Sequence, residues 1–321
     1  MRRHRSSGFL LACVAGSAAA DGLPPAGTYA FTFENDIFAG TDEGYTNGVR
    51  LSYRSDEGNL PLWGRALRGG LEPVVGERSW SVAYALGHEI YTPDDITLRV
   101  PEPDDRPYAG FLFVSFGLAA RGERAADALT LDLGVVGESS LAEEIQSFVH
   151  EVVEAEDPRG WDTQVRDEPG FRLGWRRGWA PLAGTSLSGI DADLAPVTEI
   201  SLGNVDTSAA AGLVARLGPG LPAVPDPIEP GPVEPGAGLD WRLYASAEAR
   251  VVGYDLFLQG NALRDGVEGV APSRLVGTFA LGAEIGHGPV ALGYRHVLRS
   301  RQYEAQDGPA QFGSLTLRLR L

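Results

Sequence analysis

The chain of 321 residues carries 43 acidic and 27 basic residues, which gives a formal net charge of −16. Such an acidic chain lacks the cationic surface that neutralises nucleic-acid phosphates, so its charge argues against a nucleic-acid partner. All of the basic residues are arginine, which excludes a lysine nucleophile or Schiff base. Glycine, with 42 residues, is nearly twice as frequent as usual, and this favours strands and turns.

The first twenty residues have the features of a secretory signal peptide. Three arginines precede a small or apolar run from Gly8 to Gly16, and small residues suited to cleavage follow. We expect cleavage after Ala20, which leaves residues 21–321 with a net charge of −19 and no cysteine. Acylation of Cys13, as in a lipoprotein, is the alternative, but the apolar run before Cys13 is short for such a signal.

From residue 28 onwards, apolar and polar residues alternate in segments of about ten residues. This period of two is the pattern of strands with one apolar and one polar face. We predict twelve strands, over residues 28–34, 45–55, 79–89, 110–121, 125–136, 170–179, 197–205, 209–217, 241–251, 275–285, 290–300 and 313–321. Residues 254–261 are a thirteenth candidate, which we interpret as a strand extension or a loop hairpin.

The even strand number and the secretory signal predict an all-β fold, a twelve-stranded antiparallel outer-membrane β-barrel. Residues 21–321 would form this single transmembrane domain, located in the bacterial outer membrane. Tryptophans at the ends of predicted strands favour the barrel, because aromatic girdles lie there. They are Trp80, Trp175, Trp179 and Trp241. A soluble periplasmic or secreted β-sandwich shows the same alternation and is the alternative fold.

Two segments interrupt the alternation. In residues 141–155 apolar side chains recur at helical spacing, which predicts a short helix in a loop. We expect Phe148 within the apolar stripe of this helix and His150 on the opposite, solvent-facing side. Residues 218–236 are too rich in proline for a strand or helix, and they predict an extended, solvated loop without chemistry of its own.

Polar residues concentrate in the hairpin between the first two predicted strands, where Asn35, Asp36 and Thr46 come together. With His150 and Glu156 they form a set of one imidazole and several oxygen donors. Such donors favour calcium over transition metals. A calcium ion that polarises an ester carbonyl, beside a histidine that deprotonates water, would hydrolyse esters without a protein nucleophile. The sequence contains no motif of serine hydrolases, zinc proteases or phosphate-binding loops.

Several blocks of the sequence occur together in a fixed order. They are Phe33-Glu34-Asn35-Asp36, Thr41-Asp42 with Tyr45-Thr46-Asn47-Gly48, Ile90-Tyr91-Thr92-Pro93, Asp105-Arg106-Pro107-Tyr108-Ala109-Gly110, His150 with Glu156, and Gly160-Trp161-Asp162 with Gln164. Through these blocks, residues 33 to 170 resemble the outer-membrane lipid A deacylase family, and the remainder is similar only as barrel strands. The resemblance implies a twelve-stranded barrel that uses calcium to hydrolyse the ester of the 3′-linked acyloxyacyl chain of lipid A.

The resemblance also implies roles for single residues. His150 would be the general base that activates water, in a catalytic site shared with the oxygen donors. The calcium ligands, direct or through water, would be Asn35, Asp36, Thr46 and Glu156. Arg99 would contact a substrate phosphate, at a position where this chain has Leu98-Arg99 instead of a basic pair. Trp161 and Gln164 would support the segment that bears His150.

Other functions stay open at this stage. A non-catalytic barrel, either a channel or a structural protein, could keep the same framework, because fold does not determine function. The polar hairpin would then be an ordinary turn. A phospholipid esterase is a third alternative, because phospholipids also present an ester beside a phosphate. We expect a monomer whose partner is lipid A or lipopolysaccharide, with residues 35–46 at the outer leaflet if both chain ends lie in the periplasm.

Overall fold

The computed structural model describes residues 26–39, 44–153, 156–228 and 238–321, without the side chains of residues 37, 39, 44–46, 152 and 153. The predicted signal peptide, with Cys13 and the cleavage site at Ala20, lies outside the described residues. The last two residues of the predicted helix at 141–155 and residues 229–236 of the proline-rich segment also lie outside them.

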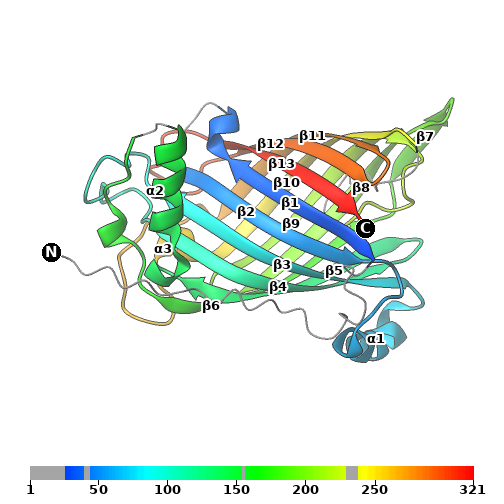
Figure 1. Cartoon of the computed structure of the whole chain (residues 1–321), viewed down its shortest axis with the longest axis horizontal. Helices are drawn as coiled ribbons and strands as arrows, with labels where there is room; N and C mark the ends of the chain where they lie inside the picture. The colour runs from blue at the N-terminus through cyan, green and yellow to red at the C-terminus, as the bar shows by residue number, and fades with distance from the viewer. Residues whose placement is uncertain (1–25, 40–43, 154–155, 229–237) are drawn as a thin grey trace.

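Long antiparallel strands make up most of the fold (Figure 1). Twelve of them form the barrel: β1 Gly27–Asn35, β2 Gly44–Ser55, β3 Ser79–Thr92, β4 Ala109–Arg121, β5 Ala125–Val136, β6 Glu168–Trp179, β8 Ile190–Gly203, β9 Asp206–Pro219, β10 Asp240–Asp255, β11 Leu275–His287, β12 Val290–Arg299 and β13 Ala310–Arg320. Neighbours in the chain pair in order, and β1 also pairs with β13 while β6 pairs with β8. The sheet closes on itself, which confirms the predicted twelve-stranded antiparallel barrel.

Two details of the strand prediction are wrong. A short strand, β7 (Ala183–Leu187), pairs only with β8 and extends their hairpin beyond the barrel wall (Figure 1). The thirteenth candidate, at 254–261, extends β10 at residues 254 and 255 as one interpretation had it, but the helix α3 (Leu256–Gln259) follows instead of further strand. The Asp255 carboxylate accepts a hydrogen bond of 2.9 Å from the Phe257 N–H, and this helix cap ends the strand.

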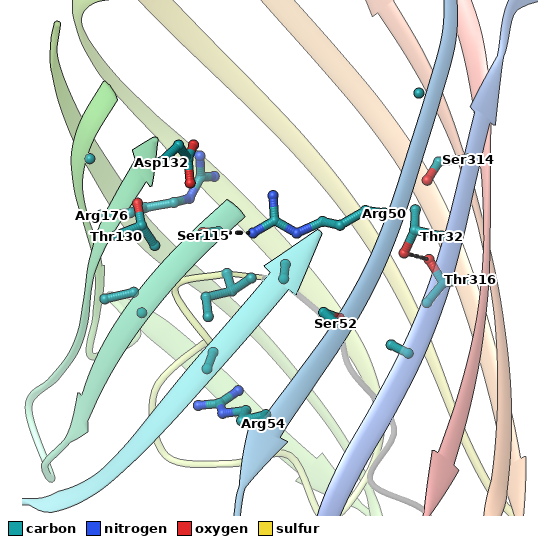
Figure 2. Close-up of a pocket in the computed structure, with 18 of the residues that line it drawn as sticks. Thr32, Arg50, Ser52, Arg54, Ser115, Thr130, Asp132, Arg176, Ser314 and Thr316 are labelled. Atoms are coloured by element: carbon teal, nitrogen blue, oxygen red, sulfur yellow. Dashed lines mark hydrogen bonds between the residues drawn. The ribbon is translucent and has the colours of Figure 1, made fainter. Parts of the chain in front are cut away.

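Side chains alternate between the outer wall and the lumen. Phe31, Leu51 and Leu86 are register partners on β1, β2 and β3, and each is about half exposed on the outer wall. Thr32 of β1 and Arg50 of β2, which are the chain neighbours of Phe31 and Leu51, point into the lumen (Figure 2). An apolar outer wall around a polar lumen is the arrangement of an outer-membrane barrel.

Ion pairs fill much of the lumen. The guanidinium of Arg172 lies 2.9 Å from Glu89 and 2.9 Å from Asp132, and Arg176 lies 2.8 Å from Glu248. Figure 2 shows Asp132 and Arg176 projecting inward from different strands. A cavity of about 460 Å³ remains between these side chains. The lumen is therefore polar but largely neutralised by its own charges.

The two rims of the barrel carry different elements. The α2 rim carries η1 (Asp36–Ala39), η2 (Glu138–Ser140), α2 (Ala142–Val153), η3 (Trp161–Thr163) and α3. The α1 rim carries α1 (Leu62–Val75), β7 and the C-terminal end of β13 (Figure 1). Helix α2 confirms the helix predicted within 141–155, whereas α1 was not predicted, and three glycines and a proline within it disfavour a helix. No described helix is long and apolar enough to span a membrane.

The proline-rich segment is not the solvated loop that was predicted. Residues 218 and 219 belong to β9, and Val224 and Asp226 in the following loop are buried. The Asp226 carboxylate lies 2.6 Å from Arg54 and 3.0 Å from Arg121. Burial alone would raise the pKa of Asp226, but these two arginines lower it below its ordinary value. The ion pairs of Asp226 thus hold the described part of the loop, 220–228, against the barrel at the α1 rim.

Candidate active site on the outer wall

Polar side chains interrupt the apolar outer wall near the α2 rim. Asn35 and Asn47 are direct register partners of β1 and β2, so their side chains lie on the same face. They stand an even number of residues from Phe31 and Leu51, and therefore on the outer wall. Both are buried, although lipid would surround an uncovered position there.

Helix α2 and the turn before it cover the neighbouring strands β3 and β4 at this rim. A side chain at Gly110 of β4 would collide with Ser140 and Ala142, so glycine allows this segment to lie directly on the wall. Ala142 also packs with Ile90 of β3 and with Trp161, and all three are buried. Helix α2 therefore lies outside the barrel, across the ends of β3 and β4 (Figure 1).

His88 of β3 attaches the covering segment to the wall. Its Nε2 lies 2.9 Å from the Ser140 carbonyl oxygen, which can only accept, so Nε2 carries the proton and donates it. Its Nδ1 is buried and finds no hydrogen-bond partner in the described part of the chain. His88 is buried on the outer wall beside the asparagine pair, since its register partner is Val49, two residues after Asn47.

The imidazole of His150 is held in one tautomer. Its Nδ1 lies 2.6 Å from the carbonyl oxygen of Glu156, so Nδ1 carries the proton of the neutral ring. Its Nε2 is then an unprotonated acceptor, 3.4 Å from the side-chain nitrogen of Gln146. The Gln146 oxygen accepts a hydrogen bond of 2.8 Å from the Trp161 indole N–H, which sets the orientation of the amide. His150 thus presents a basic nitrogen whose direction is fixed from two sides.

A continuous set of contacts links His150 to the hairpin. Gln146 contacts both His150 and Trp161, and Trp161 packs in the same buried cluster as Ile90. Ile90 is the register partner of Asn47, which in turn pairs with Asn35. The segment that bears His150 and the polar hairpin therefore lie over neighbouring strands at the same rim of the barrel.

The predicted orientation of α2 is wrong. His150 and Gln146 are buried toward the barrel, whereas Phe148 is 66 % exposed, although its stripe was expected to be the packed one. Ile145 of the same stripe does pack against the buried cluster of Ile90, Tyr108 and Trp161, while Gln146 and His150 are buried through their contacts with Trp161 and with the Glu156 backbone. An apolar side chain that points away from the barrel at this rim points toward lipid rather than water.

The oxygen donors of the hairpin suit a hard cation. Asp36, the first residue of η1, is fully buried next to Asn35, and the Asn47 side-chain oxygen is buried without a hydrogen-bond partner among the described residues. Calcium takes carboxylate, amide and water oxygens in this way. No group of three or more His, Cys, Asp or Glu side chains within the described ranges could hold a metal. Carboxylate and amide oxygens of this kind are ligands of calcium rather than of transition metals.

Three other predicted site residues are placed less completely. Thr46 lies in β2 at an irregularity of the register with β3, but its side chain is outside the described residues. Glu156 contacts His150 through its backbone oxygen, and its side chain is exposed. Arg99 is exposed in the loop between β3 and β4, which meets the loop after α2 where the Arg159 N–H donates to the Ile96 carbonyl at 2.8 Å.

Tyr108 fastens these two loops together. Its ring lies 4.8 Å from that of Trp161, and its hydroxyl donates a hydrogen bond of 3.2 Å to the Ile96 carbonyl. Burial raises the pKa of Tyr108 to about 12, so the hydroxyl stays a donor at neutral pH. A side chain at Gly160 would collide with the Tyr108 ring, which explains the glycine before Trp161.

Aromatic side chains flank the polar site on the wall. Phe38 of η1 lies 5.8 Å from Phe33 and 6.4 Å from Tyr294, measured between ring centroids. A side chain at Gly313 of β13 would collide with Phe38, so glycine lets η1 fold onto the wall. Phe38 is 41 % exposed, and the exposed Phe148 lies on α2. An acyl chain would find apolar contacts beside the polar groups.

Sequence reasoning missed three buried polar residues of this site, namely Gln146, Asn47 and His88. Gln146 precedes His150 by four residues, which is the spacing of side chains that meet on a helix and could have revealed it. The role of His88 carries no comparable local signal, because it depends on a segment more than fifty residues away in the sequence.

Comparisons with known proteins agree with this architecture. The family model described as "Outer membrane protein LpxR" matches residues 7–321. Among solved structures, LpxR from Salmonella typhimurium aligns with 92 % of this chain and 100 % of its own, at a TM-score of 0.74 and 20 % identity. At that identity the likeness concerns the fold alone. No protein with a curated description matches the chain.

More distant barrels align with lower scores. The β domain of the Bordetella autotransporter BrkA covers 93 % of this chain and 100 % of its own, at a TM-score of 0.46 and 11 % identity. The transport unit of the autotransporter AIDA-I from Escherichia coli covers 94 % of this chain and 92 % of its own, at 0.44 and 8 %. Since the family model spans nearly the whole sequence, the chain belongs to the LpxR family of outer membrane proteins.

Proposed function

We propose that this protein is a lipid esterase that removes the 3′-linked acyloxyacyl chain from lipid A. The observation that carries the proposal is the oriented imidazole of His150, which is buried at the same rim where the hairpin places its buried oxygen donors on the outer wall. A channel would use polar groups in its lumen and would have no need of them here. Membership of the LpxR family and the resemblance to the lipid A deacylases support the same substrate.

The proposed reaction is attack by water on the ester. Nε2 of His150 takes a proton from water, and the resulting hydroxide oxygen bonds to the ester carbonyl carbon. The bond from that carbon to the sugar oxygen then breaks, and the imidazolium returns the proton to this oxygen. The products are the free acyloxyacyl acid and a sugar hydroxyl. The Glu156 carbonyl keeps the imidazole in the tautomer that this step requires, and water replaces the long contact of the Gln146 amide at Nε2.

We propose calcium as the cofactor, held by Asn35, Asp36 and Thr46. The exposed carboxylate of Glu156 would contribute through water, and the Asn47 oxygen is a further donor that the sequence did not suggest. When bound, the cation would polarise the ester carbonyl and stabilise its developing negative charge.

Arg99 is the proposed contact for a lipid A phosphate. It is exposed on the α2 rim, and a guanidinium forms strong paired hydrogen bonds with phosphate oxygens. All the proposed site residues come from one chain, so we expect the monomer to be sufficient for activity.

The test is mass spectrometry of lipid A from cells that contain the protein, with calcium present. We expect loss of the mass of the 3′ acyloxyacyl chain, abolished by His150→Ala and retained in His287→Ala, which alters an exposed histidine of β11 far from the site. Unchanged lipid A with the intact, folded protein would contradict the proposal.

A second assay separates the possible ester substrates. Purified protein is incubated with pure lipid A and, separately, with pure phospholipid, and the released fatty acids are measured. We expect release from lipid A. Release from phospholipid alone would assign the same chemistry to a different lipid.

A further inference from the structure

Helix α1 packs against the outside of the barrel at the α1 rim. Trp80, Val82 and Leu118 form a buried cluster that the helix covers with Trp63 and Leu71. Val82 precedes the exposed outer-wall residue Leu86 by four positions, so the cluster lies on the lipid-facing side of β3 and β4. The helix therefore occupies a position that lipid would otherwise fill.

A second apolar face of α1 has no protein cover in the described part of the chain. Leu62 is 80 % exposed, Val74 83 % and Leu67 44 %. At about 100° per residue these side chains fall within a sector of about 140°, which also contains Ala66, Gly70 and Pro73. Trp63 falls in the same sector and packs against the barrel, so the exposed face adjoins the covered one. The charged residues lie on a separate face, where Arg68 pairs with Glu72 at 3.0 Å and Arg65 is exposed.

A row of aromatic rings fixes the level of α1 relative to the membrane. Tyr29, Tyr53 and Tyr84 are register partners on the outer wall. The ring centroid of Tyr53 lies 5.0 Å from that of Tyr29 and 6.4 Å from that of Tyr84. Trp63 of α1 extends this row, because its ring lies 6.0 Å from Tyr84 and its indole N–H donates a hydrogen bond of 3.0 Å to the Tyr84 hydroxyl. Such girdles lie at the boundary between headgroups and acyl chains.

We propose that α1 is an interfacial helix, embedded parallel to the membrane in the phospholipid leaflet at the α1 rim. Its apolar face continues the lipid-facing wall, and its level is that of the aromatic girdle. The exposed Leu62 and Val74 insert between acyl chains, while Arg65 on the charged face remains at the phosphates, as in other amphipathic helices that lie in an interface. The helix would stabilise the depth of the barrel in the membrane, independently of any activity at the α2 rim.

Single cysteines labelled with an environment-sensitive fluorophore test this proposal. The full chain with Cys13→Ser receives Leu62→Cys or Val74→Cys on the apolar face, or Arg65→Cys as the matched control on the same helix. Each protein is reconstituted into vesicles of phosphatidylethanolamine and phosphatidylglycerol. Folding is checked by the faster gel migration of unheated barrels, and quenching is measured with spin-labelled phospholipid and with aqueous iodide.

At Leu62 and Val74 we expect emission at shorter wavelength, loss of emission with spin-labelled lipid, and protection from iodide. At Arg65 we expect stronger quenching by iodide than at the other two sites. The proposal is overturned if Leu62 and Val74 are quenched by iodide and not by the lipid. That result would mean that the face is open to water, as expected if it were a surface for a soluble protein.

Discussion

The lumen and the outer-wall site both bury polar groups, but they satisfy them differently. In the lumen, Arg172 is matched by two carboxylates, and Arg318 lies 2.7 Å from Glu284. Glu89 and Asp132 each leave one buried oxygen without a hydrogen-bond partner in the described regions, but each pairs with Arg172 through its other oxygen. On the outer wall, the Asn47 oxygen and His88 Nδ1 are buried without such a partner, and His150 Nε2 faces only the long contact of 3.4 Å from Gln146. Polar groups that neutralise one another stabilise the barrel, whereas incompletely satisfied groups are available to a ligand.

The surroundings strengthen this contrast. Water can enter a polar lumen, so a charge there always has a substitute partner. On the outer wall the alternative to a partner is lipid, in which an unsatisfied polar group costs several kcal/mol. A polar cluster in that position therefore requires protein cover or a bound ligand, and α2 covers the neighbouring strands β3 and β4.

The largest expected effect is that of His150→Ala, compared with Arg50→Gln in the lumen. Loss of a general base lowers kcat by about 10²- to 10⁴-fold. Arg50 donates a hydrogen bond of 3.2 Å to Ser115 across the lumen, and its removal should leave the rate of acyl release unchanged. Initial rates with pure lipid A measure both. An equal loss in the two variants would remove the distinction between the regions.

The next effect concerns stability and belongs to the α1 rim. Asp226→Ala leaves Arg54 and Arg121 without their shared buried partner, which we expect to lower the free energy of unfolding by about 3 kcal/mol. Glu57→Ala is the matched control, because Glu57 lies 3.9 Å from the same Arg121 but is exposed, and should cost less than about 1 kcal/mol. Urea unfolding in detergent measures both. Similar urea midpoints for Asp226→Ala and Glu57→Ala would mean that the loop is not held by Asp226.

A smaller effect is expected for Gln146→Leu, which removes the contact to His150 Nε2 and leaves the Trp161 N–H unpaired. A lost buried hydrogen bond of this kind corresponds to about a tenfold lower kcat, with little change in KM. Trp161→Phe removes the donor to Gln146 and also part of a buried ring, so its kcat should fall as well once the protein is shown to be folded. An unchanged kcat in the folded Gln146→Leu variant would mean that Gln146 does not position the imidazole.

The smallest effect is a pH dependence of stability that arises from Asp226. Its pKa in the folded protein is lowered, so its contribution is fully present above the unfolded value of about 3.9 and is lost as the pH falls through the folded value. We expect the difference in unfolding midpoint between the native protein and Asp226→Ala to shrink below about pH 4. A difference that stays constant down to pH 2 would contradict the assignment.

The sequence predicted most of the wall and part of the site. Period-two alternation located the twelve barrel strands, because each side chain of a strand faces either lipid or lumen. The segment with His150 and the hairpin with Asn35 were recognised from residue types and from the family resemblance. The burial of Asp226 was not predictable, since its partners Arg54 and Arg121 lie on β2 and β4, far away in the sequence.

For helix α2, the sequence predicted the element but not its buried face. Its length and helical period follow from local residue spacing, and these were correct. Which of its faces is buried depends on what lies beneath and around it, and periodicity alone cannot distinguish an apolar stripe that faces a core from one that faces lipid. The sequence by itself thus determined the strands, the helix and the chemical types of the candidate residues. Only the tertiary structure decided that His150 is buried and that the asparagine pair lies on the outer wall at the same rim, because barrel closure and the docking of α2 bring together elements that are distant in the chain.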